Sequence, residues 1–115
     1  METLGITIDR LEPDVVLVTL DGGLEFSRAY TFDEEMRRLE AQRPRAIVLD
    51  LRKLNFLDSA GIGRVLALQR RAHRDGRRLF VVRGSRAVQR LFAITAMDAR
   101  LELVNEPQAA MAALA

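Results

Sequence analysis

Two linked stretches, Ala46-Ile47-Val48-Leu49-Asp50-Leu51 and Asp58-Ser59-Ala60-Gly61, decide the fold. The first is an apolar run typical of a strand buried on both faces, and residues 52–57 are expected to form a short turn after it. From Ser59 to Asp75 the apolar residues recur at helical spacing, and Gly76 is expected to cap that helix. Ser59 therefore lies at a strand-to-helix junction, where its hydroxyl can be exposed and where free helix N–H groups favour an anion.

Strand and helix patterns alternate on both sides of this junction. Further strands are expected at residues 4–10, 15–20, 78–83 and 101–104, and further helices at about 27–43, 86–96 and 108–114. The short connection between the first two strands predicts an antiparallel hairpin, and Asp21-Gly22-Gly23 is expected to end the second strand. The later strand–helix–strand units favour parallel, right-handed crossovers. We therefore predict an α/β fold, a single domain over residues 1–115. Its mixed sheet has four or five strands with an N-terminal antiparallel hairpin, and about four helices pack on it.

Helical spacing also predicts which side chains face the core. In the helix 59–75 the inward side chains are expected to be Ile62, Val65, Leu66, Gln69 and Ala72. In the helices before and after it, the core candidates are Tyr30, Met36, Leu39, Val88, Leu91 and Phe92.

Composition excludes several classes of protein. With 49% hydrophobic residues the chain can bury a core, yet it has no apolar run of the roughly 18 residues that a membrane span needs. The N-terminus lacks the basic and apolar regions of a secretory signal, so a cytoplasmic location is expected. The chain has no cysteine, which excludes disulfides and thiolate chemistry.

The net charge is only +2, but arginines cluster locally at Arg64, Arg70, Arg71, Arg74, Arg77 and Arg78. Such a cluster is either a patch for nucleic acid or an acidic partner, or a solvated helix face whose cations suit the helix C-terminus. We favour the second interpretation, because few aromatic residues lie among the arginines to stack on bases.

Enzyme signatures are weak. The single histidine, His73, lies roughly 21 Å along a continuous helix from Ser59, too far for a catalytic pair. Neither HExxH nor CxxC is present, so zinc has no ligand set, and Gly61-Ile62-Gly63 is not a dinucleotide fingerprint. Asp50 occupies the place of a receiver-domain phosphoacceptor, but the accompanying acidic pair and lysine are missing. We expect Asp50 to accept hydrogen bonds from turn N–H groups. The prediction is a binding module without catalytic residues, cofactor or metal.

The residues Ile47-Val48-Leu49-Asp50-Leu51 and Phe56-Leu57-Asp58-Ser59-Ala60-Gly61-Ile62-Gly63 resemble the signature of the STAS family. The resemblance covers nearly the whole chain, and the family contains anti-sigma factor antagonists and the tails of sulphate transporters. It implies that Ser59 is phosphorylated by an anti-sigma factor that is a serine kinase. The unmodified protein would bind that partner and free a sigma factor, and a serine phosphatase would reverse the modification. The resemblance implies neither direct nucleic-acid binding nor a membrane span, and it leaves a weak homodimer open.

The sequence departs from the family pattern at two positions, and three other interpretations of the Ser59 region and of the function are open. Glu25 stands where the family often has aspartate, and Ala96 stands where glycine is common before the last strand. Without the resemblance, Asp58 and Ser59 are simply good helix N-caps. Within the family, the alternatives are a scaffold subunit of a stress-signalling complex and a soluble partner of a lipid-transport ATPase.

The expected partner surface consists of two loops and the side of helix 59–75 opposite its assigned core face. Leu68 is expected to be exposed there beside small residues, which suits docking. The predicted residues are Gly23, Leu24, Glu25, Phe26, Asp58, Ser59, Ala60, Gly61, Gly63, Arg64, Ala67, Leu68 and Arg71.

Overall fold

In the computed structural model, which describes residues 3–115, five strands form one mixed sheet in sequence order. The edge strand β1 (Leu4–Glu12) pairs antiparallel with β2 (Val15–Leu24). The remaining pairs are parallel and join β2 to β3 (Ala46–Leu57), β4 (Arg78–Val82) and β5 (Glu102–Val104). The predicted mixed sheet with its N-terminal hairpin is confirmed.

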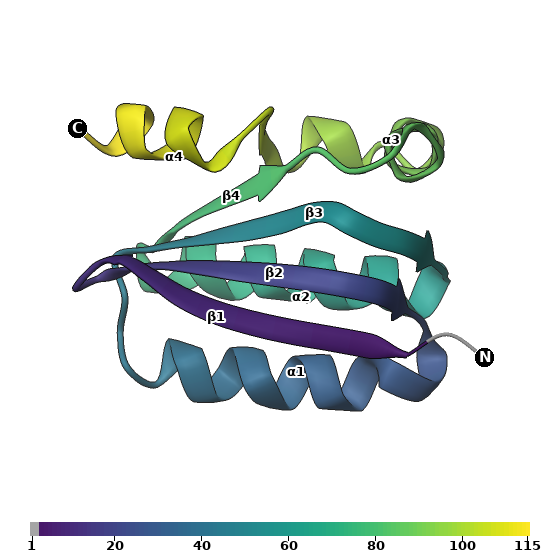
Figure 1. The fold of residues 1–115 in the computed structure, drawn as a ribbon, viewed down its shortest axis with the longest axis horizontal. Coiled ribbons are helices and arrows are strands. Elements are labelled where there is room, and N and C mark those ends of the chain that lie inside the picture. The colour runs from purple at the N-terminus through teal and green to yellow at the C-terminus, as the bar shows by residue number, and fades with distance from the viewer. Residues whose placement is uncertain (1–2) are drawn as a thin grey trace.

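Helices cover both faces of this sheet. Figure 1 shows α1 (Phe26–Glu40) and α2 (Ser59–Asp75) on one side and α4 (Pro107–Leu114) on the other. The helix α3 (Arg86–Ile94) and the short 3-10 helix η1 (Met97–Ala99) lie between β4 and β5 in the chain. None of the helices within residues 3–115 is long and apolar enough to cross a membrane. The predicted α/β class and the helix–strand alternation are confirmed.

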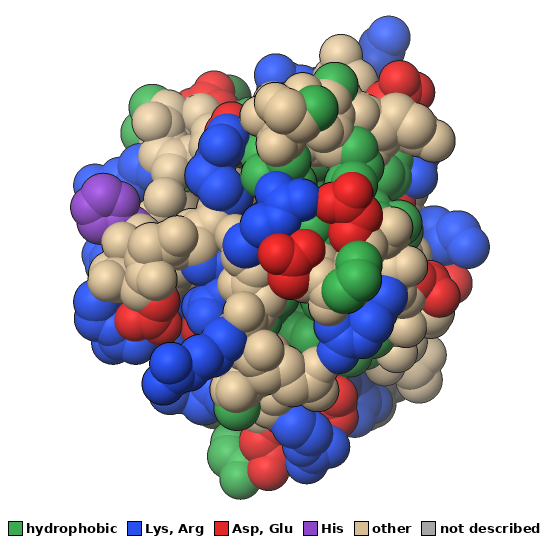
Figure 2. Space-filling view, turned by 90° about the vertical axis from the view of Figure 1, so that its left-hand side faces the viewer, with side chains coloured by type: hydrophobic (Ala, Val, Ile, Leu, Met, Phe, Trp, Pro, Cys, Tyr) green, Lys and Arg blue, Asp and Glu red, His purple; other side chains and the backbone are tan. Residues whose placement is uncertain are grey.

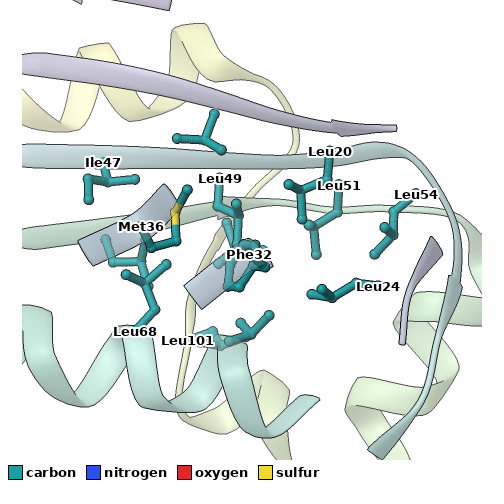
Figure 3. Packing of buried hydrophobic residues seen from close by; sticks show 14 of the residues in the cluster. Leu20, Leu24, Phe32, Met36, Ile47, Leu49, Leu51, Leu54, Leu68 and Leu101 are labelled. Atoms are coloured by element: carbon teal, nitrogen blue, oxygen red, sulfur yellow. The ribbon is translucent and has the colours of Figure 1, made fainter. Parts of the chain in front are cut away.

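Two groups of buried side chains hold the layers together. The larger group joins one sheet face to α1 and α2 and includes Phe32, Met36 and Leu68, which Figure 3 shows side by side with leucines of the strands. The smaller group, with Phe80 and Ala110, lies under α4. Because β3 contributes to both groups, its apolar run is explained by burial on both faces.

The second and third strands are longer than predicted. Asp21-Gly22-Gly23 does not end β2, and residues 52–57 do not form a turn, because β2 and β3 stay paired as far as Leu24 and Leu57. Glycine allows this extension: Gly22 has φ +106°, and a Cβ there would lie 1.9 Å from the carbonyl oxygen of Thr3. Register shifts on either side of Gly22 absorb the irregularity.

The buried side of α2 differs from the predicted one. Val65 and Ala72 are buried as expected, but Leu68 is only 1% exposed and Arg71 only 8% exposed. The prediction that Leu68 and Arg71 face solvent is wrong. The buried stripe follows Gly61, Val65, Leu68 and Ala72, while Ile62, Leu66 and Gln69 border it half-buried.

In α1 and before β5, two further side chains depart from expectation. Tyr30 is 73% exposed rather than part of the core, and Phe32 occupies the buried position instead. Ala96, where the family often has glycine, has φ +59°. This left-handed conformation costs a non-glycine residue roughly 1–2 kcal/mol. That cost explains why glycine is common at this position in the family. Gly76 caps α2 at φ +69°, as predicted.

Candidate functional site

Asp58 joins the start of two helices. Its Oδ1 accepts a hydrogen bond from the backbone N–H of Gly61 at 2.9 Å, which caps α2. Its Oδ2 accepts from the backbone N–H of Phe26, also at 2.9 Å, at the start of α1. One carboxylate therefore fixes the two loops at the carboxyl ends of β2 and β3 against each other. The two loops of the predicted partner surface are thus held together.

The first turn of α2 lies directly on the end of β2. The backbone N–H of Asp58 points to the carbonyl oxygen of Leu24 at 3.4 Å. A Cβ on Gly61 would lie 2.4 Å from that same oxygen and 2.6 Å from Leu57 Cδ1. Gly61 is thus required for the close approach. Gly63 is not, because no atom lies within 4 Å of the Cβ it lacks.

Ser59 is the first residue of the 17-residue helix α2 and is exposed. Asp58 serves as the N-cap, so capping does not occupy the Ser59 hydroxyl. No partner within residues 3–115 holds that hydroxyl, which leaves it accessible to another protein. The helix N-terminus beneath it favours an added negative charge.

The remaining predicted site residues divide by exposure. Phe26, Gly63 and Arg64 are exposed, whereas Glu25, Asp58, Ala60 and Ala67 are half-buried. Glu25 Oε1 accepts a hydrogen bond from Ser27 Oγ at 2.5 Å and makes no side-chain cap on α1. The side chains that cannot meet a partner directly are those of Leu24, Leu68 and Arg71, and the backbone of Gly23 and Gly61 is buried as well.

Two exposed aromatic side chains lie in the first turns of α1, next to the junction around Asp58. Phe26 is 80% exposed and is tied to Asp58 through its backbone, and Tyr30 follows one helical turn later. The sequence analysis included Phe26 in the partner surface but placed Tyr30 in the core. Residues four positions apart lie on the same face of a helix, so the spacing of Phe26 and Tyr30 indicates that both are exposed on one face of α1.

Asp50 accepts hydrogen bonds, as predicted, but the backbone N–H that it accepts from belongs to strand β3 and not to a turn. Its Oδ1 accepts from the backbone N–H of Arg52 at 3.0 Å, and Oδ2 accepts from Arg52 Nη2 at 2.7 Å. The bond to Asp50 raises the pKa of the Arg52 guanidinium. Within residues 3–115, no three acidic or histidine side chains gather where a metal ion could be held.

The predicted arginine cluster is largely neutralised by carboxylates. Arg71 Nε lies 2.9 Å from Glu40, and Arg78 Nη2 lies 2.7 Å from Glu102. The guanidinium of Arg74 donates to Asp75 and holds the pKa of that carboxyl below its ordinary value. Figure 2 shows the end of the molecule where the parallel strands begin, and basic and acidic side chains alternate there. Arg64, Arg70 and Arg74 are exposed, as the interpretation of a solvated helix face predicts, whereas the side chains of Arg71 and Arg77 are only 10% and 7% exposed.

A cavity of about 490 Å³ lies at the C-terminal ends of α1 and α2, whereas Ser59 lies at the N-terminal end of α2. Its walls include Arg45 and Arg77 together with Glu40 and Asp75. Arg45 already pairs with Glu12 at 2.6 Å and with Asp14 at 3.0 Å. Arg43 also lines the cavity and makes no ion pair within residues 3–115, but the cavity lies apart from the candidate site.

The two glycines of α2 give a matched prediction about the site. Gly61→Ala should lower the free energy of unfolding by about 1–3 kcal/mol, because the new methyl group collides with the Leu24 carbonyl. Gly63→Ala, in open space, should raise it by about 0.5–1 kcal/mol through helix propensity alone. Urea unfolding followed by circular dichroism measures both. Equal effects of the two variants would contradict the close approach of α2 to β2.

Comparisons with known proteins identify the family and the fold. The family model of the STAS domain matches residues 8–110. An anti-sigma factor antagonist from Mycobacterium paratuberculosis superposes with a TM-score of 0.86 at 22% identity, covering 96% of this chain and 93% of that one. The Bacillus cell fate determinant SpoIIAA in its phosphorylated form gives a TM-score of 0.74 at 17% identity, covering 96% and 100%. RsbS of Moorella thermoacetica, with a serine replaced by glutamate, gives 0.75 at 19% identity, covering 90% and 88%.

Proposed function

The chain belongs to the STAS domain family, and from that premise we propose that it is an anti-sigma factor antagonist. In its unmodified form it binds an anti-sigma factor that is a serine kinase, and phosphorylation of Ser59 switches this binding off. A serine phosphatase restores the active form. The protein acts in the cytoplasm as a binding module, without chemistry of its own.

The exposed hydroxyl of Ser59 carries this proposal. It projects from the first residue of α2 beside Asp58, whose two carboxylate oxygens are already used by the backbone of Gly61 and Phe26. A phosphate on Ser59 therefore meets no competing cap and does not require the junction to rearrange. Two of the solved structures with this fold are named for a phosphorylated form and for a serine-to-glutamate form, which is consistent with a switch at such a position.

The switch acts on the interface rather than on the fold. Phosphoserine adds about −1.5 to −2 charge, and a helix N-terminus stabilises an anion by about 0.3–1 kcal/mol. That contribution is small and of the wrong sign to unfold the domain. In a complex, the phosphate would lie next to the Asp58 carboxylate against a surface shaped for a neutral hydroxyl, which adds desolvation and like-charge repulsion.

The surface that meets the kinase is smaller than the sequence predicted. Leu68 and Arg71 are removed from it because they are buried, and Gly61 and Leu24 support it from below. The side chains that remain accessible surround Ser59 and are those of Glu25, Phe26, Asp58, Ala60, Arg64 and Ala67, together with the open backbone at Gly63.

Incubation with candidate anti-sigma kinases and ATP, followed by mass-spectrometric mapping, tests the modification. We expect phosphate on Ser59, and we expect titration calorimetry to show about 5–150-fold weaker binding of the kinase to the phosphoprotein. Ser59→Ala should keep its affinity and resist phosphorylation. Ser59→Asp should fold, because a carboxylate suits a helix N-terminus, and should bind more weakly than the wild type.

Ser85 provides the matched control for this experiment. It is an exposed serine at another helix start, where its hydroxyl caps α3 by accepting from the backbone N–H of Val88. Ser85→Ala should leave both phosphorylation and kinase binding unchanged. Phosphate on Ser85, or equal affinities of modified and unmodified protein, would contradict the switch. Failure of every candidate kinase to bind would favour the scaffold or lipid-transport role instead.

A further inference from the structure

The positive charge of the chain is concentrated in one segment. Residues 83–100 contain Arg83, Arg86, Arg90 and Arg100 but a single acidic residue, Asp98, which gives a formal charge of +3. The whole chain carries +2, so the rest of the molecule carries −1. This segment comprises α3 and η1, outside the arginine cluster that the sequence analysis singled out.

The four arginines of this segment make no ion pair within residues 3–115, and all four are exposed. The guanidinium of Arg83 donates through Nε to the neutral Asn105 Oδ1 at 3.0 Å. Elsewhere, Arg45, Arg71 and Arg78 are held by carboxylates within 3.0 Å. The segment therefore presents charge that the fold itself does not use.

A small cavity opens beside Arg83, just after the carboxyl end of β4. It measures about 200 Å³ and combines apolar walls from Phe92, Ala93 and Leu103 with the polar side chains of Arg83 and Gln89. Asp98 also lines it. Sites for cofactors and drug-sized ligands usually measure about 300–1,000 Å³. This cavity is smaller and suits one apolar side chain, and a second hollow of about 470 Å³ shares Arg83, Asp98 and Leu103 with it. On the same helix, Ile94 is 75% exposed one turn after Arg90.

We propose that Arg83, Arg86, Arg90, Ile94, Arg100 and this cavity form a second docking surface, the α3 surface. Its occupant is an acidic segment of a partner protein that inserts one apolar side chain into the cavity. Charge complementarity selects an acidic partner and accelerates its encounter. An apolar anchor in a pocket ringed by polar contacts is the usual arrangement of a binding hot spot. Its arginines lie outside the kinase surface proposed above, so its occupancy does not require the kinase or phosphorylation, although Ala87 and Leu91 of α3 line a cavity together with residues 55–57, just before Ser59.

A short synthetic peptide of glutamate and aspartate with one central leucine is the probe for this surface. Titrated into the isotope-labelled protein, it should shift the NMR signals of α3 and η1, and the affinity should fall as sodium chloride is added. The Arg86→Ala, Arg90→Ala double variant should bind it about 2–30-fold more weakly, the range for two exposed charge contacts. Replacing the central leucine by alanine should weaken binding by about tenfold or less.

Two variants separate the cavity from the charge. Ala93→Leu fills the cavity and should abolish the preference for the leucine peptide over the alanine peptide. Arg37→Ala with Arg38→Ala removes the same charge from exposed ion pairs on α1 and should leave binding unchanged. Ser59→Asp should also bind the peptide like the wild type.

Three outcomes would overturn the proposal. The first is a basic peptide that binds as well as the acidic one. The second is equal loss of binding in the Arg86/Arg90 and Arg37/Arg38 double variants. The third is binding to vesicles containing phosphatidylglycerol without binding to either acidic peptide, which would assign the α3 surface to a membrane.

Discussion

Leu68→Asp is expected to lower the free energy of unfolding by more than about 4 kcal/mol and to leave little folded protein. Leu68 is 1% exposed and packs with Phe32 and Met36 of α1 (Figure 3), so the variant loses a buried leucine and places a carboxylate among apolar side chains. Such a loss is a large part of the 5–15 kcal/mol that stabilises a typical domain. Thermal unfolding followed by circular dichroism measures it.

The neighbouring residue supplies the control. Ala67→Asp introduces the same carboxylate at a half-buried position and should cost less than about 1 kcal/mol, mainly through helix propensity. If Leu68→Asp cannot be purified, Leu68→Ala should still show a loss of about 2–5 kcal/mol. If Leu68→Ala and Leu68→Asp were both about as stable as the wild type, Leu68 would be exposed, as the sequence analysis predicted.

Arg71→Ala should destabilise the protein by about 3–5 kcal/mol, because it leaves the Glu40 carboxylate buried without its main partner. Arg71 Nε donates to both oxygens of Glu40 at 3.0 and 2.9 Å, and the two side chains are only 10% and 9% exposed. Arg77 Nη1, at 3.9 Å from Glu40, compensates only in part. Urea unfolding of the variant gives the loss directly.

Arg70→Ala is the matched control, because Arg70 is exposed and should change stability by no more than about 0.5 kcal/mol. The double variant Arg71→Met with Glu40→Leu should be more stable than Arg71→Ala, since it removes the stranded charge together with its partner. An Arg71→Ala protein as stable as Arg70→Ala would show that the ion pair does not hold α1 to α2.

Local patterns predicted the elements of the fold, and contacts between distant residues determined what the patterns missed. The strand at Ala46–Leu51 and the helix from Ser59 to Asp75 follow from periodicity, and both are confirmed. The extension of β2 through Gly22 depends on the carbonyl of Thr3, which no local pattern reveals. The partner of the buried Arg71 is Glu40, 31 residues away, so a single arginine on a helix was assigned to solvent.

At the site, the same distinction separates what was predicted from what was missed. A small, polar strand-to-helix junction with an exposed serine is visible in the sequence around Ser59. The second bond of Asp58, to the backbone of Phe26, joins residues 32 positions apart and appears only in the folded chain. The α3 surface was missed because its arginines are spread over residues 83–100, and their lack of carboxylate partners is a property of the structure.

The two edges of the sheet have a consequence for aggregation. An open strand edge can pair with another chain, and natural proteins block this with charges, bulges or short edge strands. At one edge, β1 carries Asp9, Arg10 and Glu12 around a register shift, and at the other, β5 has only three residues. Both edges thus resist the addition of a strand from a neighbouring molecule. These edges thereby hinder polymerisation of the protein into extended sheets, a property that suits the partner exchange proposed above.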